Sequence, residues 1–553
     1  MRKKNITLIS VFMVDLFILF SCSRMEKQLK PALESIKAED LAKHIEILAS
    51  DEFEGRAPST PGEEKTIQYL KNEFEALELQ PGNGDNYFQE FPIVRIVADQ
   101  NMELKVSSKK KQLQLKNMDE FLATTPLPEK QVSIKNSEIV YVGYGIVAPE
   151  YNWNDYEGLD VKGKTVMMHV NDPGYATKDA TLFNGSAMTY YGRWTFKYEE
   201  AARQGAAAAI VIHETEAAGY PFSVLQNSRT GPRFYIDAKD QKEPPCKIQA
   251  WITSEAAKKV FAAAGVDFAE QKRAAATPGF KAVDLQLKAT LTLLNQIQLA
   301  KTNNVIAVLP GSERADEYVI YTAHWDHHGI KPNLEGDNIY NGAVDNATGT
   351  SALLELAEAF TRLTQRPKRS IVFLSVSCEE QGLLGSQYYA KHPIYPPAKT
   401  VAVINMDALN ILGKMRDITV IGYGYSELDG YVLTAAKSQN RTVNPDPQPE
   451  KGYYYRSDHF SFAKEGIPAV YISRGVDHVE KGKEWVLEQR DKWTKENYHK
   501  PSDEYDPDTW NFDGMVHDVR LFFRTGFLLA MDSKFPNWQE GTEFIAKRDA
   551  MMQ

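Results

Sequence analysis

Carboxylates and histidines follow short apolar segments at several points in the second half of this chain. The apolar run at residues 370–377 leads through Cys378 into the adjacent acids Glu379 and Glu380. Five further residues of these types stand in comparable positions, namely His324, Asp326, Asp345, Asp407 and His499. Because ions of the zinc type prefer imidazole nitrogen and carboxylate oxygen, this pattern predicts a metal site.

The number of acidic residues supports this interpretation more than any single residue does. Burying several carboxylates without a cation costs several kcal/mol each, so a structural role for the whole set is improbable. Two ions about 3.5–4 Å apart can share one carboxylate. Two histidines and three carboxylates suffice for such a pair, namely His324, Asp345, Glu380, Asp407 and His499. Glu379 is then free to take a proton from water, as a hydrolase requires.

The surrounding sequence predicts an α/β domain with a mostly parallel mixed sheet flanked by helices. Nearly continuous apolar runs alternate with helical stretches such as residues 351–363; the runs are 305–309, 318–321, 371–374 and 401–404. This alternation is typical of a parallel sheet covered on both faces. Ligands of such sheets bind beyond the carboxyl ends of the strands, where His324, Glu380 and Asp407 are expected.

The first half of the chain divides into two regions. Apolar residues recur at helical spacing at Leu41, Ile45 and Leu48, and again within residues 67–74, so two helices are expected there. Residues 96–293 instead alternate short strands with one clear helix at 198–203, which indicates an inserted, mainly β module. We therefore expect the α/β domain to comprise 23–95 and 294–553.

The N-terminal sequence and the composition limit where the protein is expected in the cell and which partners it is expected to bind. A basic start and an apolar stretch to Phe20 predict an export signal over 1–22, and Leu19-Phe20-Ser21-Cys22 resembles a lipobox. We expect a bacterial protein of the periplasm or a lipoprotein of the outer membrane, anchored through acylated Cys22, with ordinary signal cleavage as the alternative. The net charge of -10 with scattered basic residues argues against nucleic acid. Cys246 and Cys378 are expected to be unpaired thiols.

The acidic motifs resemble, in order, those of the co-catalytic dizinc aminopeptidases, metallopeptidase family twenty-eight. The matching segments are His324-Trp325-Asp326, residues 342–349, Glu379-Glu380, Asn405-Met406-Asp407 and Tyr498-His499, with residues 48–56 resembling the family's N-terminal segment. The resemblance implies a zinc exopeptidase fold and two zinc ions per chain. It implies that His324 and Asp407 bind one zinc, Glu380 and His499 the other, and that Asp345 bridges them. Glu379 would be the general base, and Asp326 would orient His324. We interpret His327 and His328 as structural neighbours.

The inserted region resembles a protease-associated (PA) domain. The matching segments are residues 142–146, 163–166 and 197–207. The resemblance implies a module without chemistry of its own that roofs the cleft or limits substrate size. The family places substrate-binding residues near 452–460, so Asp458 and Tyr455 are candidates.

These observations predict an exported aminopeptidase that acts on peptide substrates. A carboxypeptidase or dipeptidase of the same fold is the alternative, and it would need a cation such as Arg456 or Arg474 for the substrate carboxylate. A glutaminyl cyclase fits less well, because related cyclases use a single zinc. A non-catalytic binding protein fits least, because all five ligands and Glu379 are present.

Overall fold

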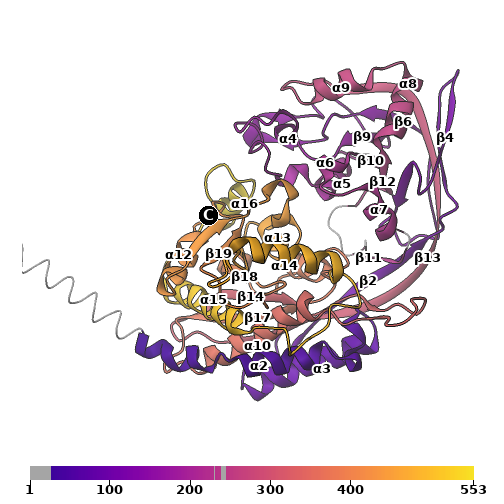
Figure 1. Cartoon of the computed structure of the whole chain (residues 1–553). Helices are drawn as coiled ribbons and strands as arrows, with labels where there is room; N and C mark the ends of the chain where they lie inside the picture. The colour runs from indigo at the N-terminus through magenta and orange to yellow at the C-terminus, as the bar shows by residue number, and fades with distance from the viewer. Residues whose placement is uncertain (1–25, 230, 238, 240–243) are drawn as a thin grey trace, which may run out of the picture. The chain divides into compact units, whose positions relative to one another are not determined.

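The chain folds into two units, shown in the computed structural model of Figure 1. The structure describes residues 26–229, 231–237, 239 and 244–553, so the predicted export signal and Cys22 lie outside the described residues. Unit 1 comprises the chain up to residue 90, 303–445 and 458–553, and unit 2 comprises 91–302 and 446–457. The segment 446–457 lies far along the chain from the rest of unit 2, and its membership of that unit was not expected from the sequence.

Unit 1 is built on a mixed sheet in which the central strands are parallel. Neighbouring strands follow the order β1–β13–β17–β14–β18–β21–β19–β20. Their bounds are β1 Gln80–Pro81, β13 Val283–Leu309, β14 Arg314–His324, β17 Arg369–Val376, β18 Thr400–Asn405, β19 Asp417–Ile421, β20 Thr442–Pro445 and β21 Ala469–Ser473. β17, β14, β18 and β21 run parallel to one another, whereas β13 and β19 are antiparallel to their neighbours β17 and β21. The predicted fold class is confirmed.

Both faces of this sheet are buried, which explains the continuous apolar runs. Alternate residues of β14 enter different cores: Val319 and Tyr321 contribute to one cluster and Ile320 to the other. β17 divides in the same way, with Phe373 on one face and Leu374 on the other. A strand buried on both faces has no polar side to alternate with its apolar side.

Helices cover the two faces. The larger core packs under the N-terminal helices and three later ones, namely α10, α12 and α15, and the smaller core packs under α11, α13 and α16. Figure 1 shows these helices around the sheet. The bounds are α2 Ala38–Leu48, α3 Pro61–Ala76, α10 Thr348–Thr361, α11 Leu384–Lys391, α12 Leu428–Ser438, α13 His459–Lys464, α14 Gly482–Glu496, α15 Asp513–Met531 and α16 Ile545–Met552. The two N-terminal helices predicted from spacing are confirmed, since Leu41, Ile45 and Leu48 are all buried in α2. None of the helices in the described part of the chain is both long and apolar enough to span a membrane.

Unit 2 combines antiparallel ribbons with a parallel group of strands. Its strands are β2 Phe88–Ala98, β3 Glu103–Ser107, β4 Gln112–Lys116, β5 Phe121–Thr124, β6 Gln131–Tyr141, β7 Val147–Ala148, β8 Trp153–Asn154, β9 Thr165–His169, β10 Ala208–His213, β11 Arg233–Ile236 and β12 Ile248–Thr253. Its helices are α4 Pro173–Thr177, α5 Trp194–Arg203, α6 Thr215–Ala218, α7 Phe222–Arg229, α8 Ser254–Ala264 and α9 Phe268–Ala275. β6, β9, β10 and β12 are parallel. The unit therefore contains more helix than the one segment predicted from the sequence.

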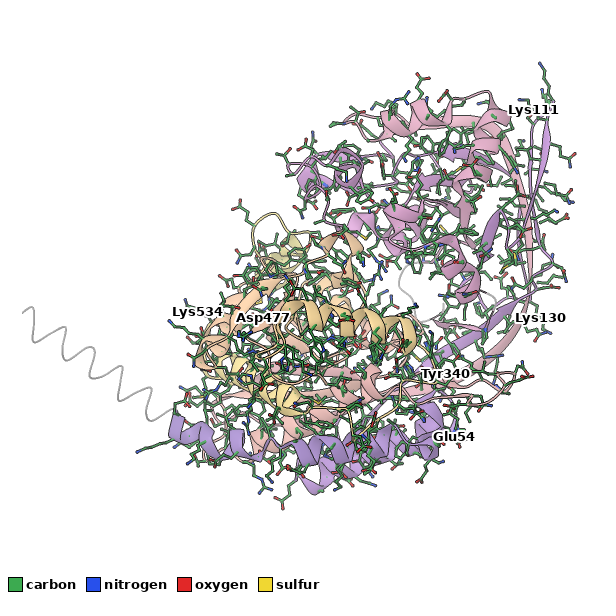
Figure 2. The ribbon with its side chains drawn as sticks, viewed as in Figure 1. Glu54, Lys111, Lys130, Tyr340, Asp477 and Lys534 are labelled. Carbon is green, nitrogen blue, oxygen red and sulfur yellow. The ribbon has the colours of Figure 1, made fainter. Side chains whose placement is uncertain are left out.

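Two smaller features are a basic run and the two cysteines. The basic run at residues 109–111 forms the exposed turn between β3 and β4, where Figure 2 labels Lys111. Cys246 and Cys378 are both buried, and within the described chain neither forms a disulfide bond, as the sequence predicts. Burial raises the pKa of the Cys246 thiol to about 12, so this group is inert at neutral pH.

The packing of α15 against β14 depends on Gly526. A Cβ built there would lie 1.8 Å from the hydroxyl of Tyr321, which donates a hydrogen bond to the carbonyl of Phe522. We expect Gly526→Ala to lower the free energy of unfolding by about 1–3 kcal/mol, because the buried tyrosine has to move. Urea denaturation measures this. Gly430→Ala, on the exposed side of α12 with no atom within 4 Å of its Cβ, should be neutral or stabilising; equal effects of the two substitutions would contradict the packing argument.

Candidate metal centre

The first group of metal-ligand type lies where two parallel strands end. His324 is the last residue of β14, Asp407 follows β18, and Asp345 lies in the loop before α10. The His324 Nε2 atom is 3.4 Å from Asp345 Oδ1 and 3.5 Å from Asp407 Oδ1. The three side chains could therefore bind one ion.

The second group uses the other oxygen of the same aspartate. His499 Nε2 lies 3.3 Å from Asp345 Oδ2 and 3.2 Å from Glu380 Oε2. Asp345 thus faces both groups, one oxygen to each. This is the arrangement expected of a carboxylate that bridges two ions.

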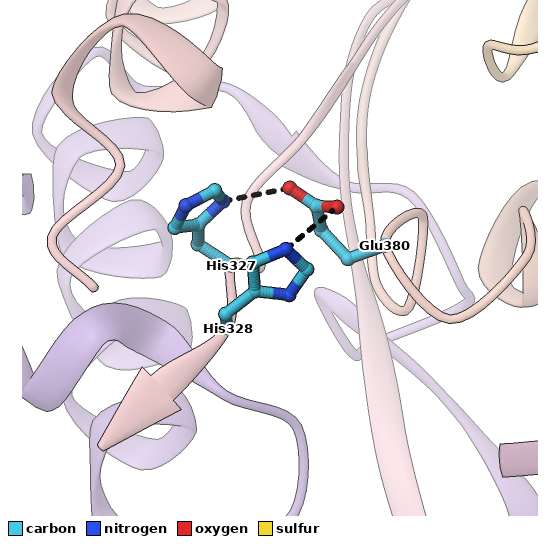
Figure 3. A group of neighbouring side chains, drawn as sticks. All are labelled: His327, His328 and Glu380. Atoms are coloured by element: carbon cyan, nitrogen blue, oxygen red, sulfur yellow. Dashed lines mark ion pairs between the residues drawn. The ribbon is translucent and has the colours of Figure 1, made fainter. Parts of the chain in front are cut away.

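A third group consists of His327, His328 and Glu380 and is drawn in Figure 3. His327 Nδ1 is 2.7 Å from Glu380 Oε1, and His328 Nε2 is 3.5 Å from Glu380 Oε2. The sequence interpretation treated both histidines as structural neighbours, but the structure directs them at a carboxylate of the site.

The hydrogen bonds of His324 test whether the residues fit a metal ion. Its Nδ1 lies 3.1 Å from the main-chain carbonyl of Asp326, which can only accept, so Nδ1 carries the proton. Its buried Nε2 has no hydrogen-bond partner and faces the two aspartates. A neutral imidazole whose free lone pair points at two carboxylates is suited to a cation between them.

Asp326 supports the site differently from what was expected. Its carboxylate is 3.8 Å from His324 Nδ1, and it is the main-chain carbonyl that contacts the imidazole instead. The carboxylate accepts backbone hydrogen bonds from Glu379 at 3.0 Å and from Glu380 at 3.4 Å. Asp326 therefore fixes the backbone of the Glu379–Glu380 pair as well as the tautomer of His324.

The electrostatics of the site show an excess of negative charge. Burial opposes the charged form of His499, but Glu380 and Asp345 outweigh it and raise the pKa of this imidazole to about 9. The pKa of His324 rises well above its usual range, because Asp345 and Asp407 outweigh the opposing effect of burial. Burial first, and then neighbouring carboxylates, raise the pKa of Glu379 well above its ordinary value. Without metal, the site therefore retains protons in place of cations.

Arg56 and Asp503, to which the sequence analysis gave no role, hold the loops around the candidate ligands in place. The Arg56 guanidinium is fully buried and donates hydrogen bonds to main-chain carbonyls at four positions, Leu48, Trp325, Asn341 and Gly342, at 2.6–2.9 Å. The carboxylate of Asp503 accepts from the backbone nitrogens of Val344 and Asp345, each at 3.1 Å. The only sequence signal for Arg56 was its place in the N-terminal motif, and Asp503 had none beyond its proximity to His499.

The two candidate substrate residues are placed differently. Asp458 is completely buried, and its pKa is raised to about 6 by burial, with His324, Asp407 and Glu380 among the charges that act on it. Tyr455 belongs to unit 2, where its ring stacks on that of Tyr190 with centroids 6.2 Å apart. The structure brings Asp458 together with the predicted ligands in unit 1, whereas Tyr455 belongs to unit 2.

Comparisons with known proteins identify similar peptidases. Residues 304–522, which include all three donor groups, match the model of peptidase family M28. The aminopeptidase NAALADL1 of Mus musculus is 31% identical over 148 residues, which cover 26% of this chain and 18% of that protein. A probable glutamate carboxypeptidase of Arabidopsis thaliana, AMP1, is 27% identical over 284 residues, which cover 47% of this chain and 35% of that one. The chain therefore spans about a third or less of the length of these relatives. The solved aminopeptidase from Aneurinibacillus sp. strain AM-1 is 19% identical, with 92% of this chain and 97% of that one covered and a TM-score of 0.49.

Arg56 provides a test of how the loops are held. Arg56→Met would leave its buried carbonyls without donors, so we expect a loss of about 3–5 kcal/mol in the free energy of unfolding, measured in urea. Arg362→Met is the matched control, because the side chain of Arg362, at the end of α10, is 60% exposed and, among the described residues, pairs with Glu358 of that helix. Its effect should stay within about 0.5 kcal/mol. Similar losses for both variants would show that the buried guanidinium does not hold these loops.

The raised histidine pKa predicts how the stability of chelator-treated protein depends on pH. His499 has a folded pKa of about 9 against an ordinary 6.5, so its stabilising contribution is complete below pH 6.5 and is lost as the pH rises through 9. Asp326, whose pKa is raised to about 8 chiefly by burial, acts in the same direction. We expect Tm in EDTA to fall by several degrees between pH 6.5 and 9, and to fall less in zinc or in His499→Gln. A Tm in EDTA that is constant or rises over this range would contradict the assignment.

Proposed function

We propose that this chain, whose residues 304–522 match the model of peptidase family M28, is a zinc-dependent aminopeptidase that removes N-terminal residues from peptides. The observation that carries the proposal is the pair of donor groups that share Asp345 through its two oxygens. One ion would be held by His324, Asp345 and Asp407, and the other by Asp345, Glu380 and His499. Two zinc ions so held would supply Lewis-acid chemistry that polarises a peptide carbonyl and makes water acidic near neutral pH.

Glu379 is the group that moves the proton. Its backbone is fixed by Asp326, and it is not a member of any of the three donor groups in the described chain. A carboxylate in this position can accept a proton from water and return it to the leaving amine. Glu380, the next residue, faces His327, His328 and His499 instead, so the two adjacent acids serve different roles.

The acidic surroundings favour a substrate that presents an ammonium group. Asp458 is buried beside the ligand groups. Its carboxylate can bind the protonated α-amino group of a peptide. N-acylation removes that charge and adds bulk, so acylated peptides should be poor substrates.

A carboxypeptidase is the second candidate, and Arg474 is the observation that favours it. This arginine follows β21 in unit 1, where Tyr471, Asp407 and Asp503 are among the groups that act on it. Burial lowers its pKa to about 10, yet it stays charged at neutral pH and could bind a substrate carboxylate. Arg456, the other cation named from the sequence, belongs to unit 2.

We also propose that unit 2 is a protease-associated domain that limits substrate size, and that the protein is exported. The motif segments 163–166 and 197–207 support the first point, since they lead into β9 and from α5 into β10. The N-terminal sequence alone supports export and lipidation at Cys22.

Substrate panels with the zinc-loaded protein distinguish the two exopeptidase activities. We expect cleavage of aminoacyl-nitroanilides, loss of this activity on N-acetylation, and a fall in kcat of at least about a hundredfold in Glu379→Gln. Glu379→Gln keeps the size of the side chain, so metal content measured in parallel should be unchanged. Cleavage that survives N-acetylation but is lost on C-terminal amidation of peptides would instead establish the carboxypeptidase, and full activity of Glu379→Gln would remove its role as the base.

A further inference from the structure

His327 and His328 form a pair of imidazoles next to the two proposed zinc positions and are not needed by either. Both follow β14, three and four residues after His324, and both reach Glu380 (Figure 3). The rings of the two histidines lie 4.7 Å apart between centroids and are tilted by 34°. His328 also meets the ring of His499 edge to face, with centroids 4.5 Å apart.

His327 has an unusual environment for a structural histidine. Its side chain is completely buried, and neither ring nitrogen makes a hydrogen bond within the described chain. Buried polar side-chain atoms usually have a partner, so this imidazole requires an explanation. Its Nδ1 forms an ion pair with Glu380 Oε1 at 2.7 Å, and neither atom has a hydrogen-bond partner within the described chain. A buried imidazole and a buried carboxylate in contact with each other can bind a shared cation after a small separation of the two groups.

The three donor groups are joined by shared carboxylates. Asp345 gives one oxygen to the His324 group and the other to the His499 group. Glu380 also links two groups: its Oε1 faces His327, and its Oε2 faces both His328 and His499. The side chain of His328 is 19% exposed, which leaves an approach from solvent on that side.

We propose that His327, His328 and Glu380 form a third divalent-cation position, next to the co-catalytic pair and linked to it by Glu380. With two imidazoles and one carboxylate, it selects ions of the zinc type, including cobalt and nickel, over magnesium and calcium. Its single carboxylate is shared with the neighbouring position, so the third ion binds more weakly than the first two. This position concerns metal binding alone and does not depend on which peptides the enzyme cleaves.

The test is the number of zinc ions bound per chain. Protein stripped with a chelator is dialysed against increasing free zinc, and bound metal is measured by mass spectrometry at each concentration. We expect binding to rise from two ions to three per chain in the wild type and to stop at two in His328→Leu. His517→Gln is the matched control, because this histidine of α15 is surrounded by Arg441, Lys414 and Arg520 rather than by carboxylates. It should still bind three.

Each other result overturns the third position in a distinct way. A wild type that saturates at two ions removes the third position but leaves the co-catalytic pair intact. Two ions in the wild type and one in His328→Leu would make His328 a ligand of that pair. Three ions in both would place the extra ion elsewhere. If His328→Leu does not fold, His327→Gln is measured instead and should also stop at two. Saturation at one ion or none contradicts both this site and the proposed dizinc enzyme.

Discussion

Unit 1 depends on how a dense group of buried carboxylates is neutralised. The carboxylates of Asp345 and Asp326 lie 3.4 and 3.8 Å from nitrogens of His324, and that of Glu380 lies 3.2 Å from His499. Each of these carboxylates would be costly to bury alone. The described chain provides a buried guanidinium at Arg56, on which Asp503, Asp326, Asp345 and Glu380 all act. One positive charge does not balance so many negative ones. In the proposed enzyme, bound divalent cations would balance the remaining negative charge, so they would stabilise the fold as well as supply its chemistry.

The sheet determines which side chains can meet in this group. Parallel strands β14, β17 and β18 end at the same edge, so His324, Glu380 and Asp407 converge although they are far apart in sequence. The other two ligands come from loops, which need separate support. Asp503 provides it for Asp345 through two backbone hydrogen bonds, and Arg56 ties the same loop to the N-terminal segment. Strand ends therefore position three of the five proposed ligands, and buried polar contacts position Asp345.

The sequence predicted the parts of this arrangement that have a local signature. The strands of unit 1 were visible as apolar runs because both of their faces are buried, and α2 was visible through its spacing. The contributions of Arg56 and Asp503 had no such signature, because hydrogen bonds between a side chain and a distant backbone leave no pattern of spacing. Long-range bonds between backbone groups are equally invisible in the sequence, as in the segment 446–457 of unit 2, where the carbonyl of Pro449 accepts a hydrogen bond from the backbone nitrogen of Met188. His327 and His328 were interpreted as structural neighbours for another reason, since an imidazole after a strand is more often structural than a ligand.

Adjacent residues Glu379 and Glu380 show how one local sequence can provide two opposite functions. Burial would raise both pKa values, but His328 and His499 lower that of Glu380 to about 2, whereas burial and nearby acids raise that of Glu379. Glu380 is thus held as an anion ready to bind a cation. Glu379 takes a proton readily, and a nearby divalent charge would bring its pKa down toward neutrality, where a general base is most effective. Environments that drive the pKa values of neighbouring acids apart are the physical basis for assigning one as ligand and the other as base. The backbone hydrogen bonds from both residues to Asp326 keep the pair in the orientation that makes this separation possible.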